Sequence, residues 1–245
     1  MMTALDHPNE IQLFQVIETF DYFYMIMEHA GGGWLWDFNP SDGIQEDEAH
    51  KLFRQLMHAM QYCHKQGIMH LDLKPQNIMV DDSGNVELID FGLSTRFTAG
   101  EKLKRIWGTC LSFAPEFTQG EEYEGLPADV GSLGIILHFM LTGRCPFRAA
   151  SREQLKKLIT QGNYDILPHV SEGTQRLINE ILMVDHLQRP TIEQVMGHPW
   201  LSQGKGAALP SPFPEALPKP PYPSFVKVMI NMGHHPYNTW VSLAS

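Results

Sequence analysis

Apolar residues alternate with polar ones near the start of the chain, over residues 11–17 and 22–27. Alternation with a period of two is typical of half-buried strands, and the intervening residues Thr19 to Asp21 suit a turn. We therefore expect two strands joined by a turn. Glu28 to Gly33 follow, and the conformational freedom of the three glycines in this stretch predicts a flexible joint after the second strand.

Further along the chain, apolar residues recur at the helical spacing of three and four. The longest such stretch covers residues 46–65 and stops at Gly67. Residues 129–141 are apolar on nearly every side, which places the predicted helix in the middle of a core. Three shorter amphipathic helices are expected at residues 155–160, 174–184 and 191–196.

Two short apolar runs follow the first long helix. Ile78 to Val80 and Val86 to Ile89 are separated by the polar, turn-forming residues Asp81 to Asn85. This arrangement predicts a β-hairpin. Polar clusters flank it on both sides, His70 to Asn77 before it and Asp90-Phe91-Gly92 after it. The hairpin would therefore fix the distance between the two clusters.

Composition narrows the class of protein. The 245 residues carry a formal net charge of −10, which argues against generic binding to nucleic acid or to an anionic membrane, because both require basic surface. The three cysteines lack the spacing of metal ligands and suit a reducing compartment. No signal peptide is visible, and the longest apolar run, Gly134 to Leu141, is too short to span a bilayer. We expect a cytoplasmic protein with no nucleic acid or membrane partner.

The two polar clusters have the spacing of a phosphoryl-transfer site. Asp72 precedes Lys74 and Asn77 in one cluster, and Asp90 opens the other. Such a site needs one carboxylate to meet the substrate hydroxyl and further oxygen atoms to hold Mg²⁺. An isolated loop aspartate is more often a helix cap or a turn residue. The order and spacing of all four residues nevertheless favour phosphoryl transfer.

With these motifs the chain resembles the calcium/calmodulin-dependent, AMP-activated-like branch of the Ser/Thr protein kinases, and within it the sperm motility kinases. The similar phrases are Leu5 to Asn9, Leu52 to Gln55, Tyr62 to His64 and Glu121 to Gly125. The resemblance implies an α+β, protein-kinase-like fold, mainly the helical C-lobe with a remnant of the N-lobe sheet. It also implies transfer of the ATP γ-phosphate to Ser or Thr of a protein substrate, with ATP and Mg²⁺ as cofactors.

The resemblance assigns roles to individual residues. Asp72 would accept the hydroxyl proton of the substrate, Lys74 would steady the transferred phosphoryl group, and Asn77 and Asp90 would ligate Mg²⁺. The glycine-containing joint would be the hinge between the lobes, with Met27 as the gatekeeper. The residues expected to contact ATP there are Met27, Glu28, Ala30 and Met79.

Residues further along the chain receive roles from the same resemblance. Asp129 would brace the backbone of the catalytic loop. Arg189 would pair with Glu116, and such a buried ion pair is costly to break from one side. Thr109 together with Lys74 would mark a Ser/Thr kinase rather than a Tyr kinase.

The sequence also departs from the family pattern. No glycine-rich phosphate loop and no strand lysine precede Asp6, so we expect an N-terminally truncated kinase with weak or no activity. Leu71 stands in the place of an arginine, and Trp34 in the place of an acidic residue. One alternative is a catalytically impaired pseudokinase that acts as a binding or scaffold module. Another is a truncated product without a stable role.

These observations divide the chain into four segments. Residues 1–27 would be the N-lobe remnant of two strands, and residues 28–201 the C-lobe. Residues 202–224 hold seven prolines and read as an extended linker. Residues 225–245 resemble part of a ubiquitin-associated domain, with a disordered tail or a stray amphipathic segment as the alternative.

Overall fold

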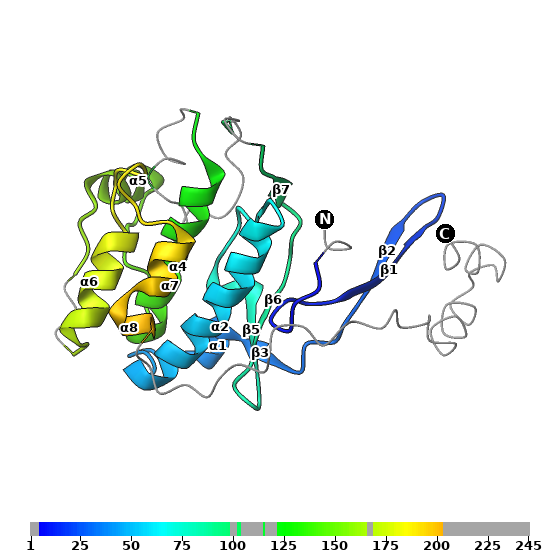
Figure 1. Ribbon diagram of the computed structural model, residues 1–245, viewed down its shortest axis with the longest axis horizontal. Coiled ribbons are helices and arrows are strands. Elements are labelled where there is room, and N and C mark those ends of the chain that lie inside the picture. Colours follow the sequence, from blue (N-terminus) through cyan, green and yellow to red (C-terminus); the bar gives the residue numbers. More distant parts are fainter. Residues whose placement is uncertain (1–4, 99–101, 104–114, 116–121, 166–168, 203–245) are drawn as a thin grey trace.

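The computed structural model describes residues 5–98, 102–103, 115, 122–165 and 169–202. It consists of a helical body and a β-hairpin that extends from one side of that body (Figure 1). The predicted linker and tail, residues 203–245, lie outside the described residues. The mixture of helices and small sheets agrees with the expected α+β class.

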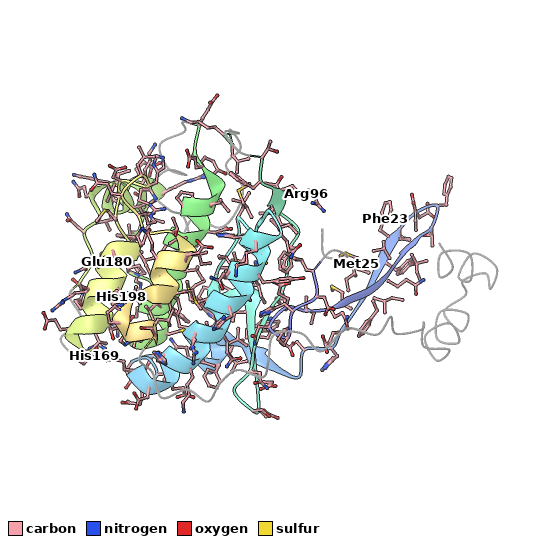
Figure 2. All side chains as sticks on the ribbon, viewed as in Figure 1. Phe23, Met25, Arg96, His169, Glu180 and His198 are labelled. Carbon is pink, nitrogen blue, oxygen red and sulfur yellow. The ribbon has the colours of Figure 1, made fainter. Side chains whose placement is uncertain are left out.

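The extended hairpin consists of the two strands predicted near the start of the chain. β1 (Leu13–Glu18) pairs antiparallel with β2 (Phe23–Met27), with Val16 opposite Met25 and a register shift near Leu13. One face of this pair is exposed and apolar. Figure 2 shows Phe23 and Met25 on the hairpin, away from the helical body, and their side chains are 71% and 59% exposed.

The residues before the hairpin are attached to the helical body. Leu88 donates its backbone N–H to the Asn9 carbonyl at 2.8 Å, and Ile11 donates to the Leu88 carbonyl at 3.0 Å. Glu10, between these two bonds, is buried and accepts a hydrogen bond from the Cys63 thiol. The chain is therefore fixed at residues 9–11, and the hairpin begins just beyond this attachment.

The body is built around two long helices. α2 (Glu46–Lys65) presents one apolar face, and α4 (Gly125–Thr142) is buried along nearly its whole length. α4 has the length and composition of a membrane-spanning helix, but 83% of it is buried within the body, which is the environment of a core helix. The shorter helices pack around them: α5 (Arg152–Gln161), α6 (Glu172–Ile181), α7 (Ile192–Gly197) and α8 (Pro199–Ser202).

Helix α4 begins four residues before the expected start at Asp129. Pro127 lies in the first turn of the helix. A proline is tolerated in the first turn of a helix because the N–H that it lacks has no intrahelical partner there. The early start places Asp129 inside the second turn, where it is fully buried.

A three-stranded sheet supports the polar clusters. The predicted hairpin is present as β5 (Ile78–Asp81) and β6 (Val86–Leu88), and β3 (Gly32–Trp34) adds to its other edge. α1 (Leu35–Phe38) and the short 3₁₀ helix η2 (Pro75–Asn77) lie next to this sheet. β4 (Ile68–Met69) and β7 (Thr95–Arg96) form a separate small pair.

The prediction of a flexible joint over Glu28 to Gly33 is wrong for its last two residues. Gly32 and Gly33 lie in β3 and pair with Asp81 and Val80. The backbones approach so closely that a Cβ atom on Gly32 would lie 2.1 Å from the Val80 carbonyl oxygen. Glycine is therefore required here for strand pairing rather than for flexibility.

Candidate functional site

The catalytic-loop residues between β4 and η2 are held by Asp129 of α4. Its Oδ2 accepts the backbone N–H of His70 at 2.9 Å, and its Oδ1 accepts that of Leu71 at 2.8 Å. Leu71 has a φ of +63°, a left-handed conformation that is unfavourable for a residue with a Cβ. Such strain costs on the order of 1–3 kcal/mol and persists where the surroundings enforce it. Asp129 supplies that enforcement, as expected from the sequence.

Three of the predicted site residues meet at one carboxylate. Lys74 Nζ lies 2.6 Å from Oδ2 of Asp72, and the Asn77 side-chain amide donates to the same oxygen at 3.2 Å. Asn77 also donates to the Asp72 main-chain carbonyl at 2.9 Å. The other carboxylate oxygen of Asp72, Oδ1, is buried and has no hydrogen-bond partner within the described part of the chain. One oxygen is thus fixed and the other is available.

His70 supports this carboxylate from the core. Its Nδ1 accepts the backbone N–H of Asp72 at 3.3 Å, so its Nε2 carries the proton that is donated to the Ile89 carbonyl at 3.3 Å. Burial lowers the pKa of His70, although the charge of Asp129 opposes this shift. A neutral ring with one donor and one acceptor matches both contacts. His70 therefore orients the backbone of Asp72 and links it to the residue before Asp90.

The strand pair β5–β6 brings the two predicted Mg²⁺ ligands to the same end of a sheet. Ile89 donates its backbone N–H to the Asn77 carbonyl at 2.9 Å, and Asp90 is the next residue. Asp90 is exposed, has a φ of +61°, and accepts the Gly92 N–H at its Oδ1 at 3.1 Å. The Asn77 amide nitrogen is used on Asp72, which leaves its side-chain oxygen for another partner.

The oxygen donors in this region fit a hard divalent cation. Mg²⁺ prefers carboxylate and amide oxygens, and it usually takes only one or two protein ligands beside substrate phosphates and water. Asp90 and Asn77 supply one carboxylate and one amide oxygen. Among the residues that the structure describes, no group of three or more His, Cys, Asp or Glu side chains is arranged to hold a metal ion.

The predicted hinge residues connect β2 to β3. Glu28 donates its backbone N–H to the Gln12 carbonyl at 2.8 Å, so that group is already used. Across the described residues, the N–H and C=O of Ala30 have no hydrogen-bond partner. Met27 is 41% exposed at the end of β2. Free main-chain groups beside an exposed apolar side chain suit a planar, hydrogen-bonding ring such as adenine.

Met79 lies in the middle of β5, directly opposite Trp34 of β3. Cross-strand partners present their side chains on the same face of a sheet. The next strand places Glu87 opposite Met79, so these three residues form one row across the sheet. Trp34 is 51% exposed. Met79, expected to contact the nucleotide, therefore has a large aromatic neighbour on the same face of the sheet.

His64 is a contributor that the sequence did not identify. It lies in the last turn of α2 and its Nε2 is 3.0 Å from Oδ2 of Asp129. Its place in a helix with no cysteine or carboxylate cluster around it is typical of a solvated or core histidine. One feature of the sequence could have indicated this role: His64 lies at the end of a predicted helix, shortly before the catalytic loop. His64 completes the set of groups around Asp129.

Several predicted contacts involve residues that the structure does not describe. Thr109 and Glu116 are among these, so the pairing of Arg189 with Glu116 lies outside the described residues. Arg189 itself is buried and donates hydrogen bonds to the carbonyls of Pro127 and Met183, at 2.5 Å and 3.0 Å for its two terminal nitrogens. It ties the start of α4 to the segment after α6.

Comparisons with known proteins agree with this arrangement. A family model described as the protein kinase domain matches residues 1–201. Sperm motility kinase 1 of Mus musculus is 46% identical over 235 residues, which are 95% of this chain and 48% of the relative. Sperm motility kinase 2B of the same organism is 44% identical over 234 residues, with the same two shares.

The putative sperm motility kinase W of Mus musculus is 45% identical over 203 residues, 82% of this chain and 41% of that protein. The chain thus spans about half the length of the relatives that it matches. The family model covers most of the chain and includes the loop in which Asp72, Lys74 and Asn77 meet. Together, the match and the relatives show that the chain belongs to the protein kinase family and is similar to the sperm motility kinases.

Proposed function

We propose that this chain carries the catalytic loop of a Ser/Thr protein kinase, which transfers the ATP γ-phosphate to a hydroxyl group of a protein. The observation that supports this most directly is the state of the Asp72 carboxylate. Its Oδ2 accepts from Lys74 and Asn77, while its buried Oδ1 has no partner among the described residues. A buried acceptor without a donor is costly, and a substrate hydroxyl would satisfy it.

In the proposed reaction, Asp72 Oδ1 accepts a hydrogen bond from the attacking Ser or Thr hydroxyl and takes its proton as the hydroxyl oxygen bonds to the γ-phosphorus of ATP. The bond between that phosphorus and the β,γ-bridging oxygen breaks, and ADP leaves with the electron pair. Lys74, already beside the carboxylate, places a positive charge next to the transferred group. Asn77 keeps the carboxylate in one orientation through its two hydrogen bonds to Asp72. This positioning is the main contribution that a protein makes to phosphoryl transfer.

Asn77 and Asp90 are the residues that would hold Mg²⁺, because each has a side-chain oxygen to offer at the same end of the β5–β6 pair. When bound, the ion neutralises charge on the phosphate oxygens. Ala30, Glu28 and Met27 would bind the adenine, and Met79 would contact its face. The free main-chain groups of Ala30 support this assignment.

Specificity for Ser and Thr and membership of the calcium/calmodulin-dependent branch are parts of the same proposal. The specificity rests on Lys74 and Thr109 in the sequence, and the branch rests on the resemblance of the phrases at Leu5 to Asn9 and Leu52 to Gln55. A cytoplasmic location is also proposed, from the reduced cysteines and the acidic composition. Cys63 and Cys145 are free thiols.

A second candidate is a binding module with little catalysis. The β1–β2 hairpin before the hinge favours it, because Phe23, Met25 and Met27 of this hairpin are exposed. Exposed apolar side chains grouped on one face are typical of a surface that binds a partner. A cover over the nucleotide that buried about 100 Å² of apolar surface would contribute roughly 2.5 kcal/mol to binding. In this second candidate such a cover is missing, and phosphate transfer is weak or absent.

One experiment on the purified 245-residue chain separates the two candidates. Its melting temperature is measured with ATP, with Mg²⁺ and with both, and phosphate incorporation into a Ser-containing peptide is followed with labelled ATP. A kinase site predicts a rise of several degrees that requires both ligands, and labelling that Asp72→Asn abolishes. No thermal shift and no labelling would leave the binding module as the function. Labelling that survives in both Asp72→Asn and Asp90→Ala would exclude the proposed site.

A further inference from the structure

The β1–β2 hairpin, which extends from one side of the helical body, has one open face (Figure 1). Strand alternation and cross-strand pairing place five exposed side chains on this face: Val16, Glu18, Phe23, Met25 and Met27. On the other face, Ile17 is only 3% exposed and Tyr24 is half-buried. The two sides of the hairpin therefore differ, and we call the five exposed residues the hairpin face.

The hairpin face is apolar except for one residue. Phe23 and Met25 are more than half exposed, and Val16 and Met27 are each 41% exposed. Phe20, in the turn at the tip of the hairpin, is fully exposed. These five apolar side chains present roughly 600 Å² to solvent, if a large side chain that is fully exposed presents about 200 Å². An apolar area of this size marks a surface that is covered in an assembly.

This apolar area matches what a dimer of the chain requires. A stable protein interface buries about 800 Å² on each partner, and about 65% of a homodimer interface is apolar. Each copy must then contribute roughly 500 Å² of apolar surface, which the hairpin face and Phe20 together supply. A two-stranded hairpin is also marginally stable and needs further strands or a helix packed against it. A second hairpin on the same face would meet that need.

The spacing of side chains along β2 suits a twofold arrangement. Phe23 and Met27 lie two residues before and two residues after Met25, so both are equally far from it along the strand. When two hairpins stack face to face with their strands reversed, the two Met25 side chains meet each other, and Phe23 of each copy meets Met27 of the other. Every one of these contacts joins apolar side chains. The hairpin face is therefore complementary to itself.

The charge on the hairpin face agrees with reversed strands. Glu18 is the only charged residue of this face, and it lies two residues along β1 from Val16, the partner of Met25. With reversed strands, the two Glu18 residues are about 13 Å apart along the strand direction, at about 3.3 Å per residue. This separation exceeds the Debye length of about 8 Å at physiological ionic strength. Stacking with the strands parallel would instead bring the two carboxylates together, which is unfavourable.

We propose that the hairpin face is a dimer interface, on which a second copy of this chain packs face to face with its strands reversed. Dimerisation of this kind does not require phosphate transfer. Interfaces of this size bind in the micromolar range or tighter, and the marginal stability of the hairpin favours the weak end, with a Kd on the order of 10 µM. At about 1 µM the chain is then mainly monomeric, and the hairpin amides exchange rapidly with solvent.

Sedimentation velocity on the full 245-residue chain, from about 1 to 100 µM, measures the dimer. ATP is left out, because Met27 is also proposed to contact adenine. The mass should double from 27.9 kDa as the concentration rises. Met25→Glu brings two carboxylates together at the twofold axis and should weaken the dimer at least about 100-fold. Leu187→Glu is the matched control, because Leu187 is 74% exposed on the helical body and should leave the dimer unchanged.

A mixture of two variants tests the reversed strands. Phe23→Lys and Met27→Glu should each be monomeric alone, and an equimolar mixture should form a heterodimer, because the new positive charge of one chain then faces the new negative charge of the other. A monomer at about 100 µM, equal dimerisation of Met25→Glu and Leu187→Glu, or a mixture that stays monomeric would each overturn the proposal. A monomer with slow hydrogen exchange over residues 12–28 would also overturn it, because another part of the same chain would then cover the hairpin face.

Discussion

Asn77 donates its side-chain amide both to the main-chain carbonyl of Asp72, at 2.9 Å, and to Oδ2 of the same residue, at 3.2 Å. A single side chain therefore fixes the carboxylate that would accept the substrate proton, while its own oxygen stays available. This arrangement makes Asn77 part of two functions at once, the orientation of Asp72 and the binding of Mg²⁺. Both should be lost together.

Asn77→Ala should lower phosphate transfer by at least about 100-fold, because a preorganised polar group at a reaction centre typically contributes that much. The Mg²⁺-dependent part of the thermal shift with ATP should also disappear. The matched control is Asn85→Ala, since Asn85 lies on the exposed turn of the same hairpin and its hydrogen bonds within the described part of the chain are all with Asp81. Equal transfer rates and thermal shifts in the two variants would contradict the assigned role.

Asp129→Ala should destabilise the fold. The substitution leaves the backbone N–H groups of His70 and Leu71 without acceptors and His64 without its partner, all in a buried site. Removing one side of a buried ionic network costs about 3–5 kcal/mol. Urea unfolding should show this loss, whereas Asp37→Ala, at an exposed position of α1, should leave the midpoint unchanged. A normal midpoint in Asp129→Ala would show that Leu71 keeps its conformation without this contact.

The proximity of Asp72, Lys74 and Asn77 was predictable from the sequence because their contacts are local. Asp72, Lys74 and Asn77 lie within six residues, and their hydrogen bonds join positions two and five apart. Such contacts follow directly from spacing. The long helices were also predictable, since α2 shows the apolar periodicity of its buried face and α4 is apolar on nearly every side. The start of α4 lies four residues before the expected one.

Contacts between distant residues were not predictable in the same way. Gly32 looked like part of a joint because its partner strand, β5, comes much later in the chain. Glu10 and Cys63 are 53 positions apart, and Glu46 and Trp200 are 154 apart. No periodicity or spacing connects such pairs, because packing of the whole domain decides them. The sequence likewise does not predict that His138 Nε2 is buried without a hydrogen-bond partner among the described residues.

Glu46 at the start of α2 holds together three parts of the helical body. Its carboxylate accepts hydrogen bonds from the backbone and hydroxyl of Ser171, from the Thr174 hydroxyl and from the Trp200 indole at 2.9 Å. Partial burial by itself raises the pKa of Glu46, but these hydrogen bonds outweigh it and lower the pKa to about 2. The ionised form is therefore the one that stabilises the fold.

Glu46→Gln should accordingly lower the melting temperature at pH 7. A carboxylate with a depressed pKa stabilises the folded state above its unfolded pKa, near 4.5, and this stabilisation is lost as the pH falls through about 2. The difference between Glu46→Gln and the unsubstituted chain should shrink between pH 5 and pH 2. Glu48→Gln, exposed in the same helical turn, should have little effect at any pH. A difference that does not change with pH would exclude ionisation as the cause.

Amides of the β1–β2 hairpin should exchange with solvent faster than those of α4. Two strands alone are marginally stable, and this pair has Val16, Phe23 and Met25 exposed on one face. Hydrogen exchange followed by mass spectrometry should show rapid labelling over residues 12–28 and slow labelling over 128–141. The Ile11 amide, bonded to the Leu88 carbonyl, should be slower than those of the hairpin. Slow exchange throughout residues 12–28 would indicate that something covers the hairpin.

Glu10 should make the stability of the fold fall as the pH rises. Burial is the main cause that raises its pKa from 4.5 to about 7, the charge of Asp6 adds to the shift, and the hydrogen bond from Cys63 opposes it. Its second carboxylate oxygen has no hydrogen-bond partner within the described residues. The folded state therefore holds a proton that the unfolded chain releases between about pH 4.5 and pH 7. Linkage then gives a loss of about 3 kcal/mol across this window, complete above pH 7.

Glu10→Gln removes the titration and keeps an oxygen that can accept from Cys63. The free energy of unfolding of this variant should exceed that of the unsubstituted chain by up to about 3 kcal/mol at pH 8, and the two should be nearly equal at pH 4.5. Urea midpoints at both pH values measure the difference. Glu18→Gln is the matched control, because Glu18 is exposed at the end of β1. If Glu10→Gln is no more stable than Glu18→Gln at pH 8, burial does not raise the pKa of Glu10 in the folded state, and its ionised carboxylate keeps residues 9–11 attached to β6 at no cost.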